Sequence, residues 1–326
     1  MLNTSLATVR SRRDFLKSSS LFLTAAAASA ALPRTLLSQA QDDSQRIDAL
    51  RKQLSGAIQV TKLSGGVSML SGAGGNIGIL TGPEGKIVID SGVSTAAPGI
   101  LQALTQLDSS PLKYLINTHW HFDHTDGNLP LHDAGATIVA HEKTRERLST
   151  PQYLAPLNLH FPAAPDKALP TRTLSSGFTF YHGAEEVILQ TVPPAHTDTD
   201  LFVYFKQSDV LHAGDVFFNG SYPLLDYSTG GNINGFIDGM SKMLSVAKDS
   251  TKIIPGHGPL ASKADFTASH DALASIRDRV SSAKKSGKSL EETIAAKPTA
   301  DFDPKLGKGF IAPDIFVTMV YKTLPM

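Results

Sequence analysis

Cysteine is absent from all 326 residues of the chain. This absence excludes a disulfide framework, a thiol nucleophile and any metal site built from thiolates. An excess of charge of one sign is also absent, because 30 basic residues balance 30 acidic ones. Nucleic-acid binding needs a basic surface, so the composition excludes DNA or RNA as a partner. A hydrophobic content of 41% still suffices for one large core, which is typical of a globular enzyme acting on a small molecule.

Long apolar runs are scarce, and the clearest uncharged segment lies near the N-terminus. Ser18–Leu32 is rich in Leu and Ala but has 15 residues, whereas a spanning helix needs about 20. The preceding sequence Ser-Arg-Arg-Asp-Phe-Leu-Lys (11–17) closely matches the twin-arginine export motif. We expect residues 1–40 to be a signal peptide for the twin-arginine export machinery, cleaved after Ala30 or Ala40 or retained as an anchor. A processed protein would be periplasmic or secreted, with no stable membrane span.

The most informative feature that is present is the sequence Asn-Thr-His-Trp-His-Phe-Asp-His at positions 117–124. Three imidazoles and one carboxylate within six residues are difficult to explain as packing. These donors suit zinc, and also iron or manganese. The preceding apolar residues predict a strand, on which His119 and His121 would point to one side and could share one metal. Asp123 and His124 would follow the strand end and turn toward a second metal.

Three more candidate ligands each follow a short apolar, β-branched run that predicts a strand. They are His196, Asp215 and His257, and each has glycine or proline beside it. Such residues allow the chain to turn sharply and to present a side chain at the end of a strand. Taken singly, each would be read as an ordinary loop residue. Following the His-x-His-x-Asp-His pattern in this order, the three together favour a metal site.

With these motifs the chain resembles the metallo-β-lactamase-fold hydrolases over most of residues 57–262. The resemblance implies an α/β fold, an αββα sandwich with the ligands along one edge. It also implies that one metal is held by His119, His121 and His196. A second metal would be held by Asp123, His124 and His257. Asp215 would bridge the two metals. Asp90, in the sequence Ile-Asp-Ser-Gly, matches an outer carboxylate that would orient a ligand imidazole, with a simple turn role as the alternative.

The resemblance further implies two divalent metal ions, with Zn²⁺ favoured and Fe or Mn as alternatives. A dinuclear hydrolase of this kind uses a metal-bridging hydroxide to attack the carbonyl of a small ester, lactone or amide. Asp123 would also relay a proton, and Tyr222, close after Asp215, is a candidate donor to the oxyanion. The first alternative is β-lactam hydrolysis, and the second is a di-iron redox enzyme on the same fold. A bridging Asp215 looks more like glyoxalase II, lactonases and related esterases than like the true β-lactamases.

The rest of the chain is divided by its pattern into further segments. Residues 41–56 predict a short helical segment and residues 263–326 a helical C-terminal cap of the catalytic domain. Helices are expected at 43–54, 96–107 and about 235–248. Strands are expected at 57–62, 66–70, 76–80, 86–90, 113–117, 136–140, 178–182, 186–192, 200–206 and 210–213.

Several other residues receive weaker assignments. The proline-rich stretch 151–170 reads as a loop, either a gating lid or an inert excursion. His212 would point away from Asp215 on a regular strand, and Asp198 and Asp200 would cap turns. Asn232 is a weak candidate for a substrate contact at the rim.

Overall fold

The computed structural model describes residues 41–325. The predicted signal peptide therefore lies outside the described residues. Two compact units divide the chain between Asp48 and Ala49. Residues 41–54 are helical, as expected for 43–54, and this helix includes the boundary between the units. The following description concerns the larger unit. No helix among the described residues is both long and apolar enough to cross a membrane.

A mixed seven-stranded sheet forms the first half of the sandwich. Its strands, in spatial order, are β1 (Ser55–Lys62), β2 (Val67–Ala73), β3 (Ile77–Leu80), β4 (Lys86–Ile89), β5 (Leu112–Ile116), β6 (Thr137–His141) and β9 (Arg172–Leu174). The pairs from β1 to β4 are antiparallel, and those from β4 to β9 are parallel. Helices α2 (Ala97–Leu107) and α4 (Asn128–Asp133) cover the outer face, where Ile79, Val88 and Leu115 pack with Ile100 and Leu131.

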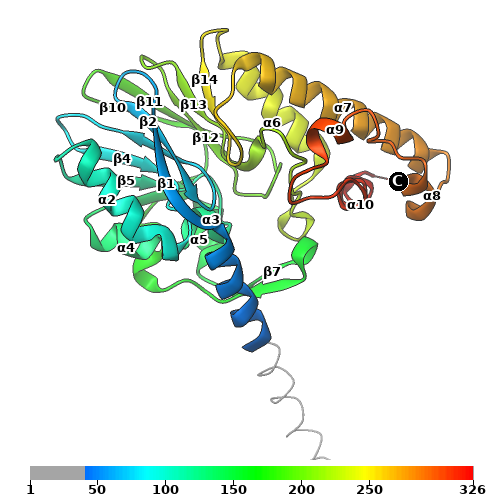
Figure 1. Ribbon diagram of the computed structural model, residues 1–326, viewed down its shortest axis with the longest axis horizontal. Coiled ribbons are helices and arrows are strands. Elements are labelled where there is room, and N and C mark those ends of the chain that lie inside the picture. The colour runs from blue at the N-terminus through cyan, green and yellow to red at the C-terminus, as the bar shows by residue number, and fades with distance from the viewer. Residues whose placement is uncertain (1–40, 326) are drawn as a thin grey trace, which may run out of the picture. The chain divides into compact units, whose positions relative to one another are not determined.

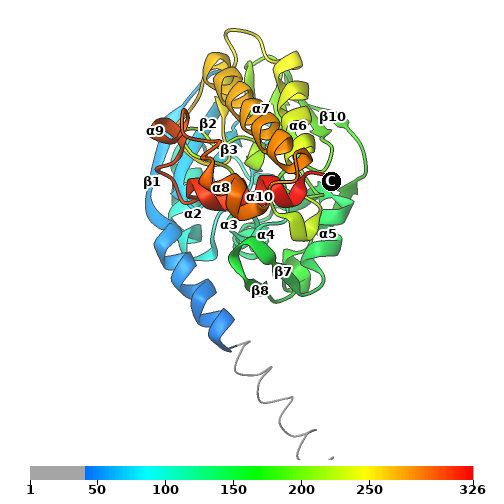
Figure 2. The same ribbon diagram turned by 90° about the vertical axis from the view of Figure 1, so that its right-hand side faces the viewer.

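The second sheet has five strands. In spatial order they are β10 (Phe178–His182), β11 (Glu185–Thr191), β12 (Leu201–Phe205), β13 (Val210–His212) and β14 (Lys252–Ile254). Helices α6 (Ile233–Val246) and α7 (Lys263–Lys285) lie side by side in Figure 2 on the outside of this half. Ser262 and Asp265 begin α7 with a reciprocal capping box, which satisfies backbone donors at its first turn.

The two sheets pack face to face around a common apolar core (Figure 1). Ile87, Ile89 and Ile116 from the first sheet meet Val187 and Val203 from the second, all with 0% exposure. Burial of both inner faces explains why these strands read as continuous apolar runs. The predicted αββα sandwich is confirmed.

The stretch 151–170 is the main secondary-structure correction. Instead of a plain loop it contains the small hairpin β7 (Gln152–Leu154) and β8 (Leu159–Phe161), whose residues Leu154 and Leu159 are buried. Strands of three residues are too short to show a period of two in the sequence, so the pattern could not predict them. The hairpin is anchored in the structure by its apolar side chains.

The C-terminal tail is helical, as its pattern predicted. After α7 the chain forms α8 (Leu290–Ala295), the short α9 (Asp303–Leu306) and α10 (Pro313–Thr323). The break between α8 and α9 includes Pro298. Phe316 and Val320 bury one side of α10 and fix it to the rest of the unit.

Candidate metal centre

The His-x-His motif lies in a loop and not on a strand, which corrects the sequence-based placement. Strand β5 ends at Ile116, and α3 begins at Phe122. Between them the Thr118 backbone N–H donates to the carboxylate of Asp90 over 2.7 Å, and its hydroxyl donates to the same group over 2.8 Å. These two hydrogen bonds take the place of strand pairing and turn the chain after β5. His119 and His121 therefore point toward the same ligand group although they do not lie on a strand.

The structure brings the seven predicted ligands together in two groups, each with its ligand-capable atoms within 4.8 Å of one another. His119, His121, His196 and Asp215 form the first group, and all four are buried. Asp123, His124 and His257 form the second group, which is more open. Apart from Asp215, which the resemblance gave as a bridge, this division is the one that the resemblance implied.

Asp215 lies between the two groups. Its Oδ2 atom is 3.3 Å from His196 Nε2 in the first group and 3.4 Å from His257 Nε2 in the second. Its Oδ1 atom is 3.0 Å from His124 Nε2. The carboxylate therefore reaches ligand nitrogens on both sides, as a bridging ligand must.

The donor set fits divalent metal ions. Zinc holds nitrogen and oxygen ligands at about 2.0–2.2 Å in a tetrahedron, which separates neighbouring ligand atoms by roughly 3.3 Å. The spacings from Asp215 Oδ2 to His196 and His257 agree with that value, and the spacing to His119 Nε2 is longer at 3.8 Å. His119 Nε2 is also buried without a hydrogen-bond partner among the described residues. A buried nitrogen with no partner is costly, and a metal ion would satisfy it.

Three outer acceptors orient the imidazoles. Asp90 Oδ2 lies 2.8 Å from His124 Nδ1, and the Leu224 carbonyl lies 2.7 Å from His196 Nδ1. Asp226 Oδ2 lies 3.2 Å from His121 Nε2. An acceptor at one ring nitrogen holds the proton there and leaves the other nitrogen free for a metal. Asp90 therefore makes the contact that an orienting carboxylate needs, and its positive φ of 66° also places it in a turn.

Asp226 is a functional candidate that the sequence did not reveal. Its side chain is fully buried, and its carboxylate also accepts the hydroxyl hydrogens of Ser228 and Thr229. An aspartate followed two residues later by serine reads as an ordinary turn cap, which it is as well. Only the contact with His121 distinguishes it, and that contact joins residues 105 positions apart.

The charges of the two groups differ. Burial, followed by the neighbouring His121, lowers the pKa of His196 to about 4. Burial lowers the pKa of His257 as well, but Asp215 and Asp123 outweigh it and raise that pKa to about 9. Without metal, His196 of the first group is therefore neutral at pH 7, whereas His257 of the second group carries a proton.

Tyr222 does not reach the cluster, which corrects its assignment as an oxyanion donor. Its side chain is buried, and its ring stacks on Phe316 of α10 with centroids 4.7 Å apart. Its hydroxyl donates to Asp303 over 2.8 Å. Burial, together with this bond, raises the pKa of Tyr222 above its usual value. The phenol holds the C-terminal helices in place and is directed away from the metal ligands.

The weaker assignments are resolved by hydrogen bonding. Asn232 accepts from the backbone of Gly235 and so caps α6. Asp200 closes the turn after His196 by accepting from the Thr197 backbone over 2.8 Å, as predicted. Asp198 forms an ion pair with Arg147 at 2.9 Å, which the turn-cap prediction did not include.

His212 is buried between the two sheets and belongs to neither ligand group. Its Nε2 atom lies 3.2 Å from the Asn76 carbonyl. Asn76 in turn donates its side-chain amide to the carbonyls of Pro255 and Gly258 over 2.9 and 2.8 Å. These bonds hold the backbone on both sides of the turn that carries His257.

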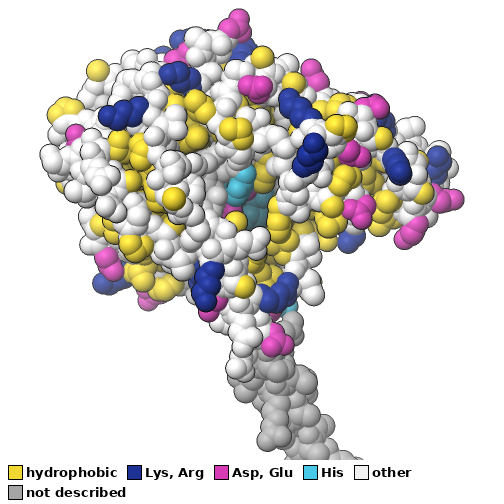
Figure 3. Space-filling view, viewed as in Figure 1, with side chains coloured by type: hydrophobic (Ala, Val, Ile, Leu, Met, Phe, Trp, Pro, Cys, Tyr) yellow, Lys and Arg dark blue, Asp and Glu magenta, His cyan; other side chains and the backbone are white. Residues whose placement is uncertain are grey.

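The centre is reached from the side of the second group. Histidine side chains are visible in Figure 3 at the bottom of a hollow that is bordered by hydrophobic side chains. The side chain of His257 is 26% exposed, compared with 1% for those of His119 and His196. Phe218 stacks on the His257 ring with centroids 4.9 Å apart. The half-buried Phe218 therefore forms an apolar wall beside the accessible ligand.

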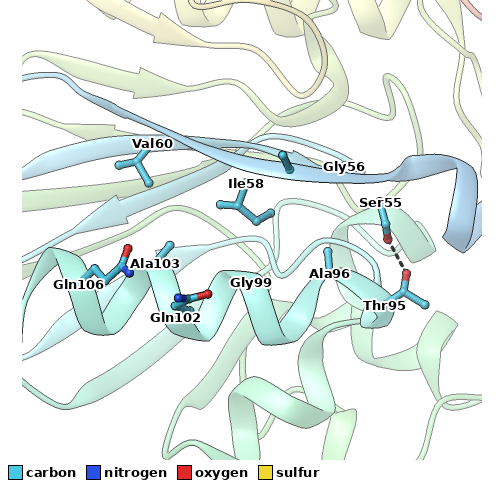
Figure 4. A pocket seen from close by; sticks show the side chains of 11 residues that line it. Ser55, Gly56, Ile58, Val60, Thr95, Ala96, Gly99, Gln102, Ala103 and Gln106 are labelled. Atoms are coloured by element: carbon cyan, nitrogen blue, oxygen red, sulfur yellow. Dashed lines mark hydrogen bonds between the residues drawn. The ribbon is translucent and has the colours of Figure 1, made fainter.

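A separate cavity of about 390 Å³ lies between β1 and α2 (Figure 4). Ile58, Val60 and Ala103 contribute its apolar walls, and Gln102 and Gln106 are its larger polar residues. None of the side chains that line it is titratable. This cavity has no group for acid–base or metal chemistry, so it is not the functional site.

Gly256 leaves space for the bridging carboxylate. A Cβ atom at this position would lie 1.9 Å from Asp215 Oδ1 and 2.7 Å from the Gly214 carbonyl. We expect Gly256→Ala to displace Asp215, to cost about 1–3 kcal/mol of folding stability and to reduce bound metal. Thermal unfolding and elemental analysis would measure both effects. Gly82→Ala is the matched control, because its Cβ would meet nothing closer than 3.9 Å; equal metal content in the two variants would contradict the expectation.

Comparison with known proteins places the chain in a family. Residues 70–264 match the metallo-beta-lactamase superfamily, and the chain belongs to this superfamily of hydrolases. Among curated proteins, "Acyl-coenzyme A thioesterase MBLAC2" of Bos taurus is 23% identical over 212 residues, which is 57% of this chain and 74% of the relative. The human (Homo sapiens) protein of the same name has the same identity and coverage.

Solved structures show the same fold at low sequence identity. A metallo-beta-lactamase from Pontibacter korlensis has a TM-score of 0.53 and 20% identity, covering 67% of this chain and 99% of its own. The stereoselective inverting sec-alkylsulfatase Pisa1 from Pseudomonas sp. has a TM-score of 0.65 and 15% identity, covering 81% of this chain and 50% of its own. These likenesses confirm the sandwich, and they leave the substrate to be argued from this chain.

Proposed function

We propose that this protein is a dinuclear metal-dependent hydrolase that cleaves a small acyl substrate, such as an ester, thioester or lactone. The observation that carries the proposal is the position of Asp215, whose carboxylate oxygens lie within 3.4 Å of ligand nitrogens in both groups. His119, His121 and His196 would hold one ion, and Asp123, His124 and His257 the other. When bound, such ions activate water and polarise a carbonyl oxygen. Zn²⁺ is the ion that this nitrogen-rich set suits best, with Fe or Mn as alternatives.

Asp123 is suited to accept a proton during hydrolysis. Burial raises its pKa, but His124 and His257 outweigh burial and hold that pKa at about 2. The carboxylate is therefore anionic throughout the neutral pH range, and 14% of its side chain is exposed toward the open side of the centre. A carboxylate with so low a pKa holds a proton only briefly, so its role would be to relay a proton from a reacting water while remaining a ligand.

The acyl substrate class is supported by two features. Phe218 offers an apolar surface beside His257, where the non-reacting part of an acyl group can pack. A curated relative that covers more than half of this chain is named as an acyl-coenzyme A thioesterase. Amides, including β-lactams, remain the second candidate because the same attack on a carbonyl would open them.

The proposal is tested by the metal content of the purified protein together with a hydrolysis screen. We expect close to two metal ions per chain and chelator-sensitive cleavage of acyl thioesters, aryl esters or lactones. Preferential cleavage of a chromogenic β-lactam would move the assignment to the second candidate. Two iron ions without any hydrolysis would favour redox chemistry, and a protein that binds no metal would overturn the proposal.

A further inference from the structure

One loop segment, residues 224–229, contacts two members of the first group from outside. The Leu224 carbonyl accepts from His196 Nδ1, and Asp226 accepts from His121 Nε2. The Trp120 indole N–H donates to the Thr229 hydroxyl over 3.4 Å. Two of the three imidazoles of the first group thus receive their outer partner from a single short segment.

Asp226 is held rigidly within this segment. Its backbone N–H donates to the His196 carbonyl over 2.9 Å, which ties it to a second ligand residue. Its carboxylate accepts from the Ser228 backbone over 3.1 Å and from two neighbouring hydroxyls. With every oxygen engaged and the side chain buried, the carboxylate cannot rotate away from His121.

The geometry at His121 shows what this carboxylate does. The ring turns its Nδ1 atom toward the cluster, where it lies 2.7 Å from His196 Nε2. Its other nitrogen, Nε2, faces Asp226. A carboxylate accepts hydrogen bonds only, so it holds the imidazole proton on Nε2 and leaves the Nδ1 lone pair free. The Nδ1 proton of His196 is held by a neutral backbone carbonyl, whereas the Nε2 proton of His121 is held by a negatively charged carboxylate.

We propose that Asp226 is the positioning residue of the first metal ion, setting the tautomer and orientation of His121. This inference rests on the proposed function, because it assumes that the first group binds a metal. Removal of an outer hydrogen-bond partner typically weakens metal binding by about 10- to 100-fold. The loss should fall on the first group, because Asp226 contacts no ligand-capable side chain of the second group in the described residues.

The same segment connects the metal centre to two peripheral parts of the unit. The Ser228 hydroxyl accepts from the Ala155 backbone at the end of β7, over 3.0 Å. The Leu225 backbone lies 3.4 Å from the Met319 sulfur on α10. The β7–β8 hairpin and the C-terminal helix thus support the first metal group through this loop, which gives both elements a role in the site.

The experiment compares Asp226→Ala, Asp226→Asn and the control Asp198→Asn in the full chain. Asp198 is an acidic residue two positions after His196 that pairs with Arg147 and contacts no imidazole of the cluster in the described residues. Zn²⁺ affinity is measured by chelator competition, Co²⁺ substitution reports ligand geometry by visible absorption, and thermal unfolding checks the fold. We expect Asp226→Ala to weaken one of two Zn²⁺ sites by about 10- to 100-fold and to change the Co²⁺ spectrum.

Asp226→Asn should restore part of the affinity, because its amide oxygen can still accept from Nε2. Asp198→Asn should keep both sites and an unchanged spectrum. Two unaltered Zn²⁺ sites and an unaltered Co²⁺ spectrum in folded Asp226→Ala would overturn the inference while leaving the proposed function intact. If the unmodified chain binds no metal, the proposed function itself fails, so the two failures are distinguishable.

Discussion

Asp215→Ala should reduce hydrolysis by on the order of 1,000-fold and lower the metal content from two ions to one. Asp215 is the only residue whose oxygens approach ligand nitrogens of both groups in the described chain. Its removal leaves the first group with three imidazoles, which still form a metal site. The second group loses its shared ligand and the negative charge that favours a cation there. Elemental analysis of the purified variant and initial rates on the best substrate of the screen measure the two effects.

Two further variants make the Asp215 result interpretable. Asp215→Asn keeps the shape and one carbonyl oxygen but removes the charge, so we expect it to retain more metal than the alanine variant. Asp238→Ala removes an exposed carboxylate from α6, and it should leave metal content and turnover unchanged. Full activity with two bound ions in Asp215→Ala would show that the bridging assignment is wrong.

The ligands were predictable because each lies in a local pattern that the chemistry constrains. His119, His121, Asp123 and His124 share eight consecutive positions with their flanking residues, and His257 lies in a Pro-Gly-His-Gly turn. In such motifs a few neighbouring residues determine where the ligand side chains lie, so the sequence spacing alone indicates the site. The structure brings the predicted residues together without adding or losing a member of the two groups.

The residues that hydrogen-bond to the ligand imidazoles were harder to predict from the sequence, because they contact ligands that are far away along the chain. Asp226 and His121 meet across 105 positions, and nothing near Asp226 separates an orienting carboxylate from a turn cap. Tyr222 shows the opposite error, since closeness to Asp215 in sequence suggested closeness in space. The chain turns after Phe218, and the Tyr222 hydroxyl meets Asp303 of the C-terminal helices instead.

Acid should empty the second metal group before the first. Binding a metal requires each ligand imidazole to release its proton, so the affinity of a protonated site rises with pH. Burial opposes the charged form of His124, but Asp215, Asp123 and Asp90 outweigh burial and raise its pKa well above the usual value. His257 has a pKa raised to about 9 for a similar reason. Both second-group imidazoles are therefore protonated at pH 7 in the metal-free protein.

His119 and His196 of the first group have the opposite charge state. Burial, followed by the charge of His124, lowers the pKa of His119 well below its usual value. The pKa of His196 is lowered to about 4. These imidazoles stay neutral as the pH falls from 8 to 6, so an ion entering the first group displaces no proton from them. An ion entering the second group must displace about two protons. Its affinity should therefore fall ~100-fold for each unit by which the pH drops below the two pKa values.

Calorimetric Zn²⁺ titration in buffers of different ionisation enthalpy measures these protons directly. At pH 7 we expect a first binding event without proton release from His119 or His196 and a second event that releases about two protons. Chelator competition at pH 8, 7 and 6 should show one site that weakens steeply as the pH falls and one that weakens much less. The Asp90→Asn variant provides a check, because losing that charge lowers the pKa of His124 and should reduce the second release. Two sites with equal proton release would contradict the charge assignment, because His119 and His196 would then have to titrate like His124 and His257.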